Sequence, residues 1–361
     1  MPLVTTTTKT VTTTTRVVSN TETSSTTPTA PAPAPAAAPQ GSVPIDRRVA
    51  DLLHPGIGRH VTLIGFPYDI GCTRNGGRPG SAGGPAAFLR LLQDRRTGTA
   101  INPEFGIDLG KLDIGFYGVI DASLTLEDGH KALEAAVKEA LDAGSIPFVV
   151  GGGNDQSYPN ASALLSHLET TPETIGVINI DAHLDVRPRT ATGLVHSGTP
   201  FRQLLEDPRF VHGASVSPLA NPNFVEFAAQ GNQCAHSHAE YVKACGGDIV
   251  WLRQIQATSS AATLFSETLD RMGGDKLFVS FDLDAVKSAD APGVSAPSPM
   301  GLSAQDALEI CFNAGTNPRV ALFDLSEMNP LVEDYRTPRL TAFMFHYFLM
   351  GVATRFGVGA I

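Results

Sequence analysis

The 361-residue sequence is poor in cysteine, in basic residues and in long apolar runs, and each shortage excludes a class of protein. Its four cysteines lack the C-x-x-C spacing of a zinc knuckle and are too few for a dense disulfide framework. Lys and Arg number 26 against 36 Asp and Glu, which gives a net charge of −10, so we expect no nucleic-acid-binding surface. No apolar run reaches the roughly eighteen residues that a membrane span needs, so we expect a soluble protein with no membrane contact.

The cysteines also bear on the compartment. Cys234 and Cys245 are close enough in sequence to bridge in an oxidising compartment, but pairing depends on geometry that a sequence does not contain. Buried thiols in a reduced, cytoplasmic protein are the favoured interpretation. The same interpretation covers Cys72 and Cys311.

Residues 1–43 differ in composition from the rest of the chain. They are rich in Thr, Pro, Ala and Ser and hold too few apolar residues to bury a core, so we expect a disordered tail with an extended Pro-Ala run. The Thr and Ser content also fits an organellar transit peptide loosely, but Arg is sparse and no amphipathic stripe is present. We expect a single folded domain over 44–361, with organellar targeting by the tail as the alternative to a cytoplasmic location.

From residue 61 onward, short apolar runs rich in Val, Ile and Phe alternate with amphipathic stretches. The runs predict buried strands and the stretches predict helices. Such alternation implies an α/β fold with one parallel sheet covered by helices on both faces, in which ligands bind beyond the carboxyl ends of the strands. The predicted strands are 61–67, 146–153, 175–183, 248–253, 276–286 and 319–328, and the predicted helices are 83–93, 126–144, 303–315 and 337–356.

Acidic residues follow three of these strands. Asp181 and Asp185 follow GVINI, Asp282 and Asp284 follow LFVSF, and Glu327 follows ALFDLS. A histidine, His183, lies between the first two acids. Alternate residues of an extended segment project to one side, so each motif presents its side chains together. Exposed turn acids are the alternative, but two such motifs behind apolar runs disfavour it. Carboxylates with few nitrogens and no thiolate favour Mn²⁺, and the number of acids predicts two bridged ions that activate water.

These motifs carry a resemblance to a known family. DAHLD at 181–185, SFDLDAVKSADAPGVSAP at 280–297 and the glutamate of DLSEMNP at 324–330 resemble the three signatures of the ureohydrolases, the arginase and agmatinase superfamily. The resemblance extends from about Val61 to Phe356. It implies a three-layer α/β/α arginase-type fold around a central parallel sheet, a single catalytic domain and a site with two manganese ions.

The finer resemblance is to the formimidoylglutamase branch. It is carried by RNGGRPGSAGGPAAFLR at 74–90, SGTPFRQLL at 197–205, APGVSAP at 291–297 and EMNPLVEDYRTPRLTA at 327–342. It implies hydrolysis of the small molecule N-formimidoyl-L-glutamate to L-glutamate and formamide, a step of histidine breakdown. Two alternatives stay open: a guanidino substrate (agmatine, guanidinobutyrate or arginine) that releases urea, and a family member of low activity.

The resemblance also implies a set of metal ligands. They are Asp181, His183, Asp185, Asp282 and Asp284, with Asn154 of GGGNDQSYP standing where the family usually has a histidine. An amide oxygen is uncharged and a poorer donor than imidazole, so we expect one of the two ions to be held weakly. This departure is also what motivates the low-activity alternative.

Further roles follow from the resemblance and from charge. Asp185 would hydrogen-bond the nucleophile and Glu327 would pair with the formimino cation. His196 lies one residue before the position of a family histidine, so a proton shuttle and a loop histidine without a catalytic role stay equally open.

Arginines are the expected partners of the substrate's two carboxylates, because the guanidinium fork binds a carboxylate at two points. Arg187 is the first candidate, and Arg78 and Arg74 follow. The alternative for each arginine is a surface residue without a role in substrate binding. The glycines of 76–84 lack the G-x-x-x-x-G-K-[ST] pattern, so we expect no nucleotide site. The sequence itself does not give the oligomeric state, but the resemblance suggests a homo-oligomer, because many members of the superfamily form trimers or hexamers.

Overall fold

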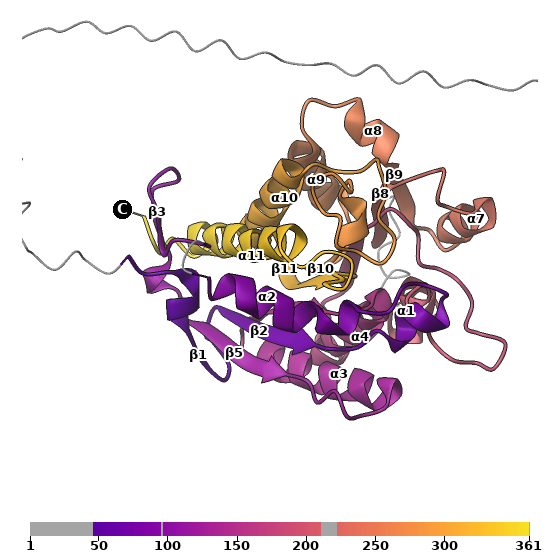
Figure 1. Cartoon of the computed structure of the whole chain (residues 1–361). Coiled ribbons are helices and arrows are strands. Elements are labelled where there is room, and N and C mark those ends of the chain that lie inside the picture. The colour runs from indigo at the N-terminus through magenta and orange to yellow at the C-terminus, as the bar shows by residue number, and fades with distance from the viewer. Residues whose placement is uncertain (1–45, 95–96, 211–221, 361) are drawn as a thin grey trace, which may run out of the picture. The chain divides into compact units, whose positions relative to one another are not determined.

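Nine parallel strands form the central sheet of the chain (Figure 1). The computed structural model describes residues 46–94, 97–210 and 222–360, so the predicted tail at 1–43 lies outside the described residues. From one edge to the other the strands are β1 (Leu53–Pro55), β5 (Ile114–Val119), β2 (Val61–Phe66), β6 (Ile146–Gly151), β11 (Val320–Ser326), β10 (Lys276–Asp282), β7 (Ile175–Ile180), β8 (Phe224–Ala229) and β9 (Asp248–Trp251). A separate antiparallel pair joins β3 (Ile101–Asn102) to β4 (Ile107–Asp108).

Helices cover both faces of the sheet, which makes the fold a three-layer α/β/α arrangement (Figure 1). One face packs against α2 (Gly84–Leu92), α8 (Leu252–Gln256), α9 (Ala261–Arg271), α10 (Ala304–Thr316) and α11 (Arg336–Arg355). The other packs against α3 (Leu126–Asp142), α4 (Ser157–Leu168), α5 (Pro200–Leu205) and α7 (His236–Ala244). Shorter elements are α1 (Ile70–Arg74) and the 3-10 helices η1 (Val49–Leu52), η2 (Ser81–Gly83), η3 (Leu109–Lys111), η4 (Asn154–Gln156) and η5 (Leu283–Ala285).

The continuous apolar runs are explained by this layering. In β6, Phe148 and Val150 face one helical layer while Val149 faces the other, so all positions must be apolar. Phe148 stacks on Phe323 of β11 with ring centroids 5.1 Å apart and an interplanar angle of 4°. Close packing of this kind supplies most of the favourable free energy of folding.

The predicted α/β fold and its elements are confirmed, with corrections at the strand ends. The strands predicted over 175–183 and 276–286 end at Ile180 and Asp282, because the chain turns where the acidic motifs begin. Asp185 has a left-handed φ of 39°, so residues 181–185 do not form the extended segment with alternating side chains that the sequence predicted. The acids converge because their strands are neighbours in the sheet.

Some elements were not predicted. β5 (IGFYGV) contains two glycines and β8 (FVEFAA) contains a glutamate, so neither has the uniform Val, Ile and Phe content of the other strands. The α4 sequence, SYPNASALLSHL, contains a proline and an asparagine and is buried on most sides, which hides its helical periodicity. Among the described residues, no helix is both long and apolar enough to cross a membrane, and all four cysteines are unpaired.

A buried histidine on α11 generates a pH prediction. The ring of His346 is 3% exposed and its Nε2 donates to the Thr99 carbonyl at 2.9 Å, and burial lowers its pKa to about 4. The unfolded chain, with a histidine pKa of about 6.5, binds this proton first, so stability is lost as the pH falls through that window. Between pH 7.5 and pH 5 the loss from this one group is about 2 kcal/mol.

Urea unfolding of the wild type and of His346→Gln at the two pH values measures that loss. The glutamine keeps a donor for Thr99 but does not titrate, so its free energy of unfolding should change with pH by about 2 kcal/mol less than that of the wild type. Identical pH dependence in the two proteins would contradict the assignment.

Candidate active site

Four adjacent strands bring the acidic motifs together at one edge of the sheet. The order β6, β11, β10, β7 places their carboxyl ends side by side, and a predicted site residue lies at or within three residues of the end of each strand. The glycines after β6 permit this arrangement, because a Cβ at Gly152 would overlap the Tyr68 carbonyl oxygen. Asn154 then opens the 3-10 helix η4 at the same edge.

The carboxylates and His183 form two groups that share one residue. Ligand atoms of Asp181, His183 and Asp284 lie within 4.8 Å of one another, and so do those of Asp181, Asp185 and Asp282. His183 Nδ1 is 3.3 Å from Asp181 Oδ1 and 3.1 Å from Asp284 Oδ2. The donor set, four carboxylates and one imidazole, is the kind that binds Mn²⁺.

The electrostatics of the cluster indicate that it is built for cations. Asp181, Asp282 and Asp284 are buried, with exposed fractions of 0%, 2% and 3%. Burial, followed by mutual repulsion, raises the pKa of Asp282 and of Asp185 well above the usual range, and burial raises the pKa of Asp284 to about 6. Within the described ranges no Lys or Arg is ion-paired to any of them, so divalent cations fit the charge that the protein leaves uncompensated.

Asn154 lies in the cluster as a hydrogen-bond donor. Its Nδ2 is 2.8 Å from Asp185 Oδ2 and 3.4 Å from Asp181 Oδ2. Its Oδ1 accepts the hydroxyl protons of Ser157 at 2.8 Å and Ser326 at 3.1 Å. In this orientation the amide oxygen points away from the carboxylates, and it must exchange places with the nitrogen before it can bind a metal.

Glu327 lies beside the cluster in a strained backbone conformation. Its φ is 64°, and it and Asp185 are two of the three described non-glycine residues with positive φ. Its Oε1 accepts the Asn154 backbone N–H at 3.0 Å and the Cys72 thiol at 3.1 Å. Burial raises its pKa to about 7.

A cavity of about 190 Å³ opens onto these side chains. Its walls include His183, Asp185, Asp282, Asp284 and Glu327. Cys72, Asn75, Ser197 and Ser295 also line it and were not predicted as site residues. Asn75, Ser197 and Ser295 lie in the motifs at 74–90, 197–205 and 291–297 that carry the finer resemblance, and these motifs were the signal that could have found them. No quoted motif includes Cys72. This cavity can hold a small polar molecule next to the carboxylates.

The three candidate arginines differ in their surroundings. Arg187 lines the cavity, and its stem lies over Gly198, where a Cβ would stand 2.9 Å from the Arg187 Cδ. Arg78 is exposed and donates to the carbonyl of Ser295, a cavity residue, at 3.0 Å. Arg74 instead pairs with Glu127 at 2.6 Å and donates to the Val195 carbonyl, which leaves it poorly placed for a ligand.

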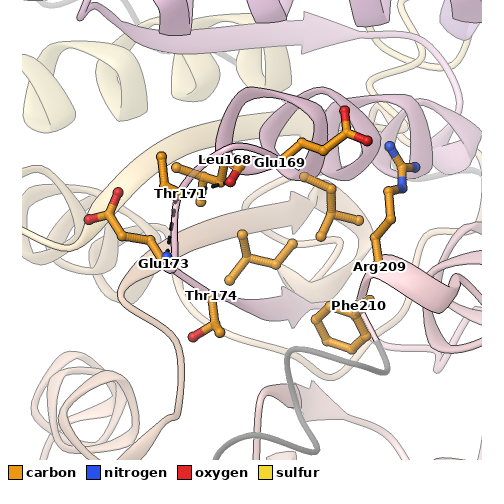
Figure 2. Close-up of a pocket in the computed structure, with 9 residues that line it drawn as sticks. Leu168, Glu169, Thr171, Glu173, Thr174, Arg209 and Phe210 are labelled. Atoms are coloured by element: carbon orange, nitrogen blue, oxygen red, sulfur yellow. Dashed lines mark hydrogen bonds between the residues drawn. The ribbon is translucent and has the colours of Figure 1, made fainter.

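A second hollow, of about 230 Å³, lies at the amino-terminal end of β7, between the end of α4 and the start of that strand (Figure 2). Four of its five polar side chains, those of Thr171, Glu173, Thr174 and Arg209, have partners within the described residues. Arg209 pairs with Asp207 at 2.7 Å and donates to Ser162, and the Thr171 hydroxyl donates to the Leu168 carbonyl. Among these described residues, little charge is left uncompensated for a ligand.

Comparisons with known proteins identify the family. The sequence matches the Arginase family over residues 59–351. A formimidoylglutamase from Rhodococcus jostii is 33% identical over 291 residues, which are 79% of this chain and 83% of that protein. The crystal structure of Trypanosoma cruzi formiminoglutamase with Mn²⁺₂ is 46% identical, with a TM-score of 0.78, and covers 86% of this chain and 99% of that one. An Asn-to-His variant of the same enzyme with Mn²⁺₂ gives the same values.

The chain therefore belongs to the arginase family, and its three-layer fold is the arginase-type fold. Within the family it is similar to the formimidoylglutamases, as the motifs at 74–90 and 327–342 predicted. An arginase from Bacillus subtilis, 22% identical with a TM-score of 0.64, shares the fold.

His196 is not brought to the carboxylates and does not line the cavity. Its ring is 6% exposed, its Nε2 lies 3.1 Å from the Pro188 carbonyl, and its Nδ1 accepts the Gly198 N–H at 3.2 Å. Both ring nitrogens are thus engaged by the backbone. This arrangement favours the loop-structural role over the proton shuttle.

Replacing His196 by Ala separates these two roles. Loss of the ring leaves the backbone groups of Pro188 and Gly198 without partners, so the free energy of unfolding should fall by about 1–3 kcal/mol while kcat changes less than about fivefold. A general acid or base would instead contribute about 10²–10⁴-fold to kcat. Steady-state kinetics at 25 °C and urea unfolding of the same preparation measure both, and a kcat loss above 100-fold would support the shuttle.

Proposed function

We propose that this protein hydrolyses N-formimidoyl-L-glutamate to L-glutamate and formamide with two Mn²⁺ ions per chain. The observation that carries the proposal is the pair of ligand groups sharing Asp181, which adjoins Glu327 and a cavity edged by Arg187. The names of the relatives supply the substrate, and the Mn²⁺₂ structures supply the metal.

Each group of ligands would hold one ion. Asp181, His183 and Asp284 would hold the first, and Asp181, Asp185 and Asp282 the second. When bound, the ions supply Lewis acidity and activate water at neutral pH. Asn154 would stabilise Asp185 through its amide N–H in the observed orientation, so the second ion has no ligand from Asn154 unless the amide rotates.

The residues around the cavity would then orient the substrate and take a proton from the attacking water. Glu327 would hold the formimino nitrogens by charge-assisted hydrogen bonds, its carboxyl being fixed by the Asn154 N–H and the Cys72 thiol. Asp185 would take the proton from the attacking water and return it to the α-nitrogen as the C–N bond breaks. That nitrogen leaves as the amine of glutamate, and the formimino carbon leaves as formamide.

A dicarboxylate substrate accounts for the arginines. N-Formimidoyl-L-glutamate carries two carboxylates, whereas arginine carries one and agmatine none. Arg187 and Arg78 would bind the two carboxylates at the cavity rim. This charge match favours the formimidoyl substrate over a guanidino compound. A cytoplasmic location and a homo-oligomer belong to the same proposal and rest on the family resemblance and the cysteine content.

Product analysis tests the proposal. The manganese-loaded protein is incubated separately with N-formimidoyl-L-glutamate, arginine, agmatine and guanidinobutyrate, and glutamate, formamide and urea are quantified. We expect equimolar glutamate and formamide from the first compound, and at least 100-fold lower kcat/KM for the others. Urea from a guanidino compound at the higher kcat/KM would overturn the substrate assignment, and no product from any compound would overturn the enzymatic one.

Arg187→Leu tests the substrate contact, with Arg74→Leu as a matched control. Loss of a charge-assisted hydrogen bond should raise KM and lower kcat/KM for N-formimidoyl-L-glutamate by about 10–100-fold. Arg74 is held by Glu127 away from the cavity, so its variant should change kcat/KM less than threefold. Equal effects of the two substitutions would contradict the assignment of Arg187.

A further inference from the structure

A buried carboxyl group lies next to the cluster without belonging to it. Glu226 stands in the middle of β8, is 0% exposed and pairs in register with Asn179 of β7. Its strand neighbour on the same face, Phe224, is apolar, and so is Val177 beside Asn179. A hydrophobic side chain would satisfy this position at lower cost, because a buried acid loses its hydration.

Hydrogen bonds connect this acid to the cluster. The Nδ2 of Asn179 donates to Glu226 Oε2 at 2.8 Å and also lies 3.3 Å from Asp181 Oδ2. Asn179 therefore links Glu226 to the residue that both ligand groups share. The backbone N–H of His183 donates to the other oxygen of Asp181, Oδ1, at 2.6 Å, so both oxygens of that carboxylate are held by donors.

The amide of Asn179 has two orientations, and Glu226 selects one of them. If its oxygen faced the two carboxyl groups, it would lie against Glu226 and Asp181, both acceptors. With Glu226 present, the nitrogen faces them and donates to both. An apolar residue at 226 would remove the stronger of the two bonds and release the amide.

We propose that Glu226 is a positioning residue which, through Asn179, fixes the orientation of the Asp181 carboxylate and so sets the affinity of the protein for its divalent cations. The inference rests on the proposed metal centre. Groups that orient metal ligands in this way typically change affinity by about 10–100-fold when they are removed.

Burial, chiefly, raises the pKa of the Glu226 carboxyl well above its usual range. Glu226 and Asn179 each leave one buried oxygen without a partner in the described structure, Oε1 and Oδ1 respectively. Buried polar atoms without a partner destabilise the fold. Their presence here is consistent with a role of Glu226 and Asn179 in the site.

The test measures manganese binding to metal-free protein by calorimetric titration, together with the melting temperature of the metal-free state. Glu226→Met keeps the side-chain length but removes the acceptor, and Glu226→Gln keeps the acceptor. We expect the Met variant to bind Mn²⁺ about 10–100-fold more weakly, with a metal-free melting temperature equal to or above that of the wild type. The Gln variant should stay within threefold of the wild-type affinity.

Two further variants make the result specific. If Glu226 acts through Asn179, the double variant Glu226→Met/Asn179→Ala should bind Mn²⁺ no more weakly than Asn179→Ala alone, because both remove one pathway. Thr268→Val, which removes a buried hydroxyl from α9 in the opposite layer, should leave the affinity unchanged. Should the Met variant not fold, Asn179→Ala and Glu226→Gln decide the matter, the first being required to weaken binding and the second to preserve it.

The outcomes separate this inference from the proposed function. Wild-type affinity in the Met variant, or additive losses in the double variant, would overturn the positioning role while leaving the metal centre intact. A wild-type protein that binds no manganese would instead overturn the metal centre, and the inference with it.

Discussion

The concentration of buried negative charge at one edge of the sheet is the constraint on which the rest of the site depends. Asp181, Asp282 and Asp284 are nearly inaccessible to water. In the described part of the chain His183 is the one cationic partner of Asp181 and Asp284, and Asp282 has no ion pair. Buried carboxylates at such distances either hold protons or bind cations. Two groups of ligand atoms that share Asp181, each within 4.8 Å of one another, favour the binding of cations.

The surrounding structure holds this charge in place at some cost. Asp185 and Glu327 adopt left-handed backbone conformations, which side chains other than glycine adopt only under constraint. Gly152 allows the chain after β6 to pass close to the backbone of Tyr68, and Asn154 follows it at the cluster. Ser157 and Ser326 orient the Asn154 amide, and Asn179, which is bonded to Glu226, lies within hydrogen-bonding distance of Asp181. The buried charges and strained backbone at the site lower the stability of the fold. Packing in the apolar layers, such as the stack of Phe148 on Phe323, compensates for this.

The sequence was sufficient for the fold class and for the residues of the cluster, because both depend on local patterns. Apolar runs followed by D-x-H-x-D and D-x-D identify strand ends, and neighbouring parallel strands then bring those ends together. The sequence did not reveal how the side chains around the cluster are oriented or which partners they contact. Nothing in GGGNDQSYP shows that two serines, one of them 172 residues away, take the Asn154 oxygen. The same holds for the pairing of Arg74 with Glu127, the contact of Cys72 with Glu327, and Glu226, whose strand was not predicted.

The most direct test of the central claim is a calorimetric titration of Mn²⁺ into metal-free protein in two buffers of different ionisation enthalpy. Such a titration gives the number of ions per chain and the number of protons released on binding. If the buried carboxyl groups form a two-cation centre, binding saturates at two ions per chain and releases protons at pH 7, because burial raises the pKa values of Asp185 and Asp282. Saturation at one ion or none would contradict the account.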